Sequence, residues 1–92
     1  MFKITRKKGF HIKFENGYTV SVQFGPGNYC SNYDREIGRD EEKCGSVGSP
    51  DAECAVWKEG GELLPHFENG NTVCGQMSPK EVLELMNWAA SQ

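Results

Sequence analysis

The sequence lacks the features that mark several common protein classes. No apolar run approaches the roughly 20 residues that a membrane-spanning helix needs, and the first residues contain no apolar signal-peptide core. Acidic residues outnumber basic ones, which gives a net charge of −3 and a pI near 5.3, whereas proteins that bind nucleic acid through its phosphates normally carry a basic excess. We therefore expect one small cytosolic domain over residues 1–92, with neither a membrane nor a nucleic acid as partner.

The cysteines lack the spacing of a known metal site. They lie at positions 30, 44, 54 and 74, and no pair has the two-residue separation of a zinc knuckle. We expect no metal ion and, in the cytosol, four reduced thiols. In an oxidising medium Cys44 and Cys54 could pair and close the segment between them. His11 and His66 belong to no metal or catalytic motif.

Catalytic signatures are absent as well. Cys30 lies in an aromatic loop, but the sequence has no signature of a cysteine hydrolase around it. Asp34, Glu36, Glu41 and Glu42 are better explained as charges that keep a long loop soluble than as an acid and base pair. The expectation is a protein that is not an enzyme, with no catalytic residue and no cofactor.

What the sequence does contain, at its start, is three rows of alternating apolar residues. A period of two is typical of strands with one face in a core and one face toward water. The rows are Phe2 and Ile4, then Phe10, Ile12 and Phe14, then Tyr18, Val20, Val22 and Phe24.

These rows also determine the register that we expect. A three-residue loop that ends at Gly17 pairs Ile12 with Val20 and keeps one face of the sheet apolar. The same arithmetic for a loop that ends at Gly9 pairs Ile4 with Ile12. Both glycines are expected in the left-handed conformation of a bulged hairpin. The first part of the chain is therefore predicted to be a three-stranded antiparallel meander.

Polar side chains occupy the alternate positions of the same strands. His11, Lys13, Thr19, Ser21 and Gln23 should all point to the face opposite the apolar rows. Two interpretations remain open for this face. It is either a solvated sheet surface, or it is a dimer surface or the floor of a ligand site.

The strand pattern resumes after a long loop. Ala52–Trp57 reads as a strand that ends in a turn at Gly60-Gly61. Residues 63–67 read as a short or edge strand, because Pro65 has no amide proton to donate. Residues 72–75 would form a further strand.

The C-terminal segment has the pattern of a capped amphipathic helix. Ser78 can cap it, Pro79 suits its first position and Glu81 completes a capping box. An apolar stripe should pack on the sheet, with Trp88 at the rim of the core. The stripe consists of Val82, Leu85, Met86 and Ala89, with Leu83 and Ala90 at its edges. The predicted fold class is α+β, a small antiparallel sheet of about five strands, meander plus hairpin, with one C-terminal helix on one face.

The glycine-rich and charged loop over 25–51 is the candidate binding segment. It is longer than an ordinary connection, and such loops are usually functional or disordered. Its glycines and amides could form an anion-binding nest, its tyrosines could stack on a base and its arginines could contact phosphates. The alternative is a structural turn whose tyrosines pack on the sheet. The candidate ligand-binding residues are Gln23, Gly25, Gly27, Asn28, Tyr29, Asn32, Tyr33, Arg35 and Arg39.

Three segments together resemble small uncharacterised accessory proteins encoded by bacteriophages. They are residues 20–32, the strand Ala52–Trp57 and the helix that begins at Ser78. The resemblance covers most of the chain except residues 35–50 and transfers no catalytic residue. It implies action in the host cytoplasm during infection, where compact acidic proteins often counter bacterial immunity.

Three functions follow from this setting. The first is a non-enzymatic phage protein that binds a small phosphorylated nucleotide signal, as a homo-oligomer, through the glycine and tyrosine loop. The second is an inhibitor of a host defence protein, which presents Asp40, Glu41 and Glu42 to a basic surface. The third is a minor structural component of the phage.

Overall fold

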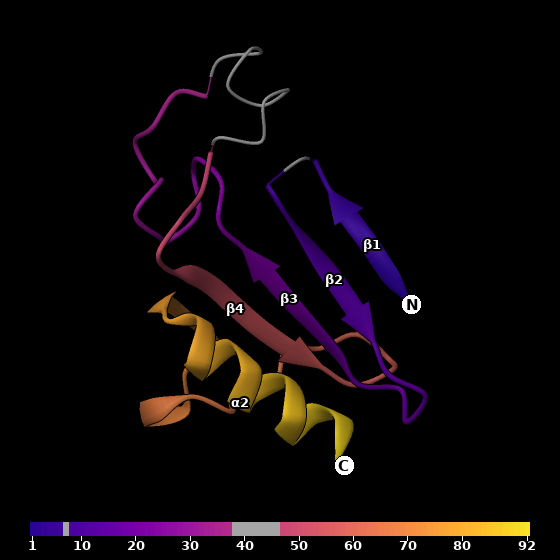
Figure 1. Ribbon diagram of the computed structural model, residues 1–92. Helices are drawn as coiled ribbons and strands as arrows, with labels where there is room; N and C mark the ends of the chain where they lie inside the picture. The colour runs from indigo at the N-terminus through magenta and orange to yellow at the C-terminus, as the bar shows by residue number, and fades with distance from the viewer. Residues whose placement is uncertain (7, 38–46) are drawn as a thin grey trace.

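The computed structural model describes residues 1–6, 8–37 and 47–92, which form a five-stranded antiparallel sheet with one helix against one face (Figure 1). Strand order in the sheet follows chain order, as in a meander. The predicted α+β class is therefore confirmed. The elements are β1 (Phe2–Thr5), β2 (Gly9–Lys13), β3 (Thr19–Gln23), β4 (Ala52–Trp57), a 3₁₀ turn at Glu68–Gly70, β5 (Val73–Met77) and α2 (Pro79–Ala90).

The hairpin between β2 and β3 has the predicted register. Ile12 lies opposite Val20, and the Gly17 N–H donates to the Phe14 carbonyl oxygen at 3.0 Å. Gly17 has a φ of 88°, a left-handed conformation that glycine adopts without steric cost. The bulged three-residue loop is confirmed.

The hairpin between β1 and β2 differs from the prediction. Ile4 lies opposite Phe10 rather than Ile12, and Arg6 adopts positive φ, at 46°, while Gly9 lies inside β2. Gly9 is needed for a different reason, since a Cβ atom there would lie 2.0 Å from the carbonyl oxygen of Val22 on β3. The register is shifted by two residues, so each side chain keeps its predicted face.

One predicted strand does not form. Residues 63–67 make only a single bridge to β4, between Leu63 and Trp57, with the Leu64 N–H donating to the Val56 carbonyl oxygen at 2.8 Å. Pro65 follows at once and cannot extend the ladder. The fifth strand is instead β5, which begins one residue later than the predicted 72–75 segment and continues to Met77.

Helix α2 begins as the sequence predicts. The Ser78 hydroxyl accepts a hydrogen bond from the Glu81 N–H at 3.2 Å, and the Glu81 carboxylate accepts one from the Ser78 N–H at 2.9 Å. These bonds to the ionised carboxylate lower the pKa of Glu81. Val82, Leu85 and Ala89 are buried against the sheet.

The core lies under α2 and leaves one side of the sheet uncovered. Helix α2 contacts β3, β4 and β5, and Figure 1 shows β1 and β2 extending away from it. Phe2 and Ile4, on the uncovered part of the apolar face, are 73% and 84% exposed. The apolar face of the sheet is thus covered by α2 over β3, β4 and β5, and it is open at β1.

Candidate functional site

The polar face of the sheet gathers side chains from four strands. Because residues directly opposite each other in a ladder share a face, Lys3 lies beside His11, and Thr19 lies between Lys13 and Trp57. These positions alternate with the apolar rows. A basic and aromatic set is therefore held by the sheet itself.

Two aromatic rings cover the floor of this face. The centroids of the His11 and Trp57 rings lie 5.0 Å apart at an interplanar angle of 82°, an edge-to-face contact. Thr19 and Ser21 lie on β3, between the two strands that carry these rings, and are buried. The interpretation as a simple solvated surface is therefore wrong for the middle of this face, since two of its polar side chains are shielded from water.

A cavity opens above this floor. Its volume is about 360 Å³, within the range of roughly 300–1,000 Å³ that is usual for small-molecule sites. We call it the polar-face pocket, lined by Met1, Lys3, His11, Lys13, Thr19 and Trp57.

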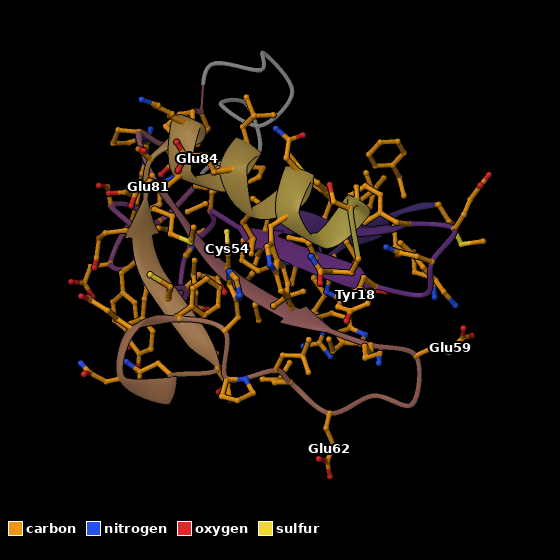
Figure 2. All side chains as sticks on the ribbon, turned by 90° about the horizontal axis from the view of Figure 1, so that it is seen from below. Tyr18, Cys54, Glu59, Glu62, Glu81 and Glu84 are labelled. Atoms are coloured by element: carbon orange, nitrogen blue, oxygen red, sulfur yellow. The ribbon has the colours of Figure 1, made fainter. Side chains whose placement is uncertain are left out.

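Positive charge lies at two sides of the polar-face pocket. The Lys13 ammonium pairs with the Glu59 carboxylate at 3.0 Å, and Figure 2 shows Glu59 on the loop that follows β4. The pKa of His11 is lowered from its usual 6.5, first by desolvation and second by the charge of Lys3. His11 is therefore mainly neutral at pH 7, and an anion placed beside Lys3 would favour its protonation.

The glycine and tyrosine loop, residues 25–33, differs in geometry from the polar-face pocket. The rings of Tyr29 and Tyr33 stack in parallel with centroids 5.8 Å apart, and the two side chains are 60% and 47% exposed. Their exposure means that they are not packed into the core. Gly75 allows this loop to lie close to β5, because a Cβ atom at that position would lie 2.8 Å from the Tyr29 Cβ atom and 2.9 Å from the Tyr29 carbonyl oxygen.

The amides of this loop already have acceptors. The Tyr29 N–H donates to the Glu53 carboxylate at 3.1 Å, and the Ser31 N–H donates to the Asp51 carboxylate at 2.6 Å. Ser31 is also the main reason that the pKa of Asp51 is lowered. In the turn at residues 25–28, where the anion-binding nest was predicted, the amides of Gly25, Gly27 and Asn28 donate to backbone carbonyl oxygens, so they are also occupied within the protein.

The remaining candidate residues do not converge on one point. The Gln23 amide bonds to Ser21 and to Thr5 on the polar face, at 3.1 and 2.9 Å. The buried Asn32 amide donates to the carbonyl oxygens of Phe24 and Gly48, which ties the loop to its own ends.

Other members of the candidate set remain near the turn. Gly27 has a φ of 83° and Asn28 donates to the Gly25 carbonyl oxygen at 3.2 Å, while Arg35 is exposed at the end of the loop. Arg39 lies outside the described residues, as do the acidic residues 40–42.

Cys30 does not have the setting of a nucleophile. It is buried, and its Sγ atom contacts the Gly25 carbonyl oxygen at 3.6 Å. Among the described residues no group of three or more histidine, cysteine and acidic side chains could hold a metal ion. No helix formed by the described residues is long and apolar enough to cross a membrane.

Lys3 and Trp57 were missed as members of a candidate site. The alternation of strand residues could have identified them, because both residues occupy the same alternate positions as His11, Lys13 and Thr19. What the sequence did not provide was the pairing of β4 with β3, which brings Trp57 to Thr19.

Compared with known proteins, the chain matches no family model, no curated protein and no solved structure.

Proposed function

We propose that this protein binds a small anionic ligand that carries an aromatic ring, of the phosphorylated-nucleotide class, in the polar-face pocket, without catalysing a reaction on it. The observation that carries the proposal is the cavity of about 360 Å³, which combines lysines with aromatic rings over a buried polar floor. Sites for small ligands usually have this combination of concave shape and few convergent polar groups.

Charge favours the polar-face pocket over the glycine and tyrosine loop as the phosphate site. Lys3 can contact phosphate oxygens, and His11 can gain a proton when a phosphate lies there, whereas Lys13 would have to exchange its pairing with Glu59 for the phosphate. In the loop, a phosphate would instead meet the carboxylates of Asp51 and Glu53, which already accept from the amides. Phosphate and base recognition are therefore both assigned to the sheet.

Aromatic rings supply the second half of the proposed recognition. Trp57 is partly exposed at the pocket and offers a surface for a nucleobase, a type of contact that contributes about 1–3 kcal/mol per base. The resemblance to phage accessory proteins supports a setting in the host cytoplasm, where sequestering a nucleotide signal would counter host defence. The ligand itself would be a cyclic nucleotide or an ADP-ribose derivative.

The test is a binding screen with matched variants. Cyclic nucleotides and ADP-ribose are added to the full chain, and the melting midpoint should rise by mass action if they bind the native state. Lys3→Gln and Trp57→Leu should remove most of this rise. Lys80→Gln is the matched control, because Lys80 lies exposed on α2 and does not line the pocket.

Two further probes separate the parts of the ligand. Pyrophosphate lacks the ring and adenosine lacks the phosphate, so each should raise the midpoint less than the complete nucleotide. The variant Tyr29→Ala tests whether the glycine and tyrosine loop is the ligand site instead. If Tyr29→Ala abolished the ligand-induced rise while Lys3→Gln and Trp57→Leu preserved it, the site would be the loop and the proposal for the sheet would be overturned.

A second candidate function is protein binding on the uncovered apolar face. Ring contact between Phe2 and Phe10, with centroids 6.3 Å apart, continues into a groove of about 240 Å³ that includes Val22 and Pro79. Exposed apolar patches of this kind mark interaction surfaces. The occupant that we propose is a second copy of the chain, in agreement with the expected homo-oligomer, and a host defence protein is the alternative.

Light scattering after size exclusion tests the second candidate. A dimer of the unmodified chain should become a monomer in Ile4→Lys, because a charge would be placed in the interface. Leu83→Lys is the matched control, since Leu83 is an exposed apolar residue on α2 instead. A monomeric unmodified chain at high concentration would contradict self-association and leave a different protein as the occupant.

A further inference from the structure

Two free cysteines face each other across neighbouring strands. Cys54 of β4 lies directly opposite Cys74 of β5. Cys54 is a buried member of the core and Cys74 is a partly buried residue packed against that core, so both side chains lie on the α2 side of the sheet. Figure 2 shows Cys54 beneath α2.

This placement meets the geometric requirement of a disulfide. Opposed residues in an antiparallel pair have Cα atoms about 4.5–5.5 Å apart, inside the span of about 4.4–6.8 Å that a disulfide bridges. The Cys44 and Cys54 pair considered from the sequence lacks such support, because Cys44 lies outside the described residues. We propose that Cys54 and Cys74 form an intramolecular disulfide when the protein meets a low-molecular-weight disulfide of the glutathione type.

Chemically, the bond forms by two thiol–disulfide exchanges. The Cys74 thiolate attacks one sulfur of the small disulfide, which forms a mixed disulfide and releases one small thiolate. The Cys54 thiolate then attacks the Cys74 sulfur and releases the second. The two protons lost by the cysteines end on the two small thiols, so the protein is oxidised by two electrons and the small disulfide is reduced by two.

Burial sets the order and the rate of these steps. Desolvation raises the pKa of the Cys54 thiol to about 12, with a smaller contribution from Cys74. Cys74 is the more exposed thiol, although desolvation and the neighbouring carboxylates raise its pKa as well. Oxidation at pH 7 should therefore be slow, begin at Cys74 and accelerate as the pH rises.

The bond would fix more than the two strands. Residues next to Cys74 hold the glycine and tyrosine loop, because the Gln76 N–H donates to the Tyr29 carbonyl oxygen at 2.9 Å. Ser78, which caps α2, follows β5 directly. A disulfide at Cys74 would therefore anchor both the loop and the start of the helix to β4.

Peptide mapping of the oxidised full chain tests the proposal. After incubation with oxidised glutathione, the expected product is a monomer with Cys54 linked to Cys74, and its melting midpoint should rise by about 10 °C or more. Cys74→Ser is the matched variant and should show no such rise, with Cys54 still reduced. Glutathione that remains on Cys74 without closure, or a product in which Cys54 is linked to Cys44, would overturn the assignment.

Discussion

The two halves of the sheet differ in what holds them in place. Strands β3, β4 and β5 lie under α2, and the fully buried side chains Val20, Val56 and Cys54 come from β3 and β4. The β1 strand has similar apolar residues, yet Phe2 and Ile4 remain exposed. The half that α2 covers is held by packing, and the half that contains β1 is held mainly by its ladder of hydrogen bonds.

This difference indicates where the molecule can be altered without loss of the fold. Free energy of unfolding depends on apolar area removed from water, so it should reside mostly in the half covered by α2. The uncovered half contributes both Lys3 and the exposed apolar face. Since the polar-face pocket also includes Thr19 of β3 and Trp57 of β4, binding is expected where the two halves meet.

The largest expected effect is in the covered half. Leu85→Ala should lower the free energy of unfolding by about 3 kcal/mol, because it leaves a cavity under α2, while Ile4→Ala should change it by less than about 0.5 kcal/mol. Denaturant titration measures both values, provided that the free energy of unfolding depends equally steeply on denaturant concentration in each variant. Equal losses at the two sites would mean that the uncovered face is buried in solution, as by a second copy.

A smaller loss is expected where the two halves join. Gly9→Ala should cost about 1–3 kcal/mol, because its methyl group would displace the backbone of β3 at Val22. Gly48→Ala is the control, since no atom lies within 4 Å of the position of its added Cβ. If the two alanine variants had the same denaturation midpoint, the close approach of β2 to β3 would be wrong.

The helix cap gives the next effect. Ser78→Ala should lower the free energy of unfolding by about 0.5–2 kcal/mol, because the Glu81 N–H loses its acceptor. Ser91→Ala is the comparison at the other end, where the hydroxyl donates to the Asn87 carbonyl oxygen at 2.7 Å. A larger loss at Ser91 than at Ser78 would place the stabilising end of α2 at its C-terminus.

Protonation of His11 should give the smallest effect. Its pKa is lowered in the folded state, so between that pKa and the unfolded value of 6.5 the unfolded chain binds more protons. Stability should therefore fall as the pH drops below about 6.5 and level off below the folded pKa. NMR titration should show that Lys3→Gln raises the pKa of His11, and an unchanged value would contradict the assigned contribution of Lys3.

Ligand binding should respond to pH in the opposite sense. An anion in the polar-face pocket favours the protonated form of His11, so its affinity should increase as the pH falls through the region below 6.5. His11→Gln should flatten this dependence of the dissociation constant. The same variant would also remove the pH dependence of stability that arises from this residue.

The sequence by itself determined the parts that depend on short-range chemistry. Alternation assigned each side chain of β1, β2 and β3 to its face, Gly17 placed the loop between β2 and β3, and Ser78 with Glu81 placed the start of α2. These are local preferences, in which a residue and its neighbours a few positions away decide the outcome. They do not require knowledge of what lies across the sheet.

Only the tertiary structure decided the contacts between distant segments. The register of β1, the partner of Cys54 and the place of Trp57 beside Thr19 all depend on which strands become neighbours. The loop amides likewise found acceptors on Asp51 and Glu53, more than 19 positions away. Because backbone amides bond to whichever acceptors the folded chain brings near them, the sequence of a loop does not reveal whether its amides remain open to a ligand.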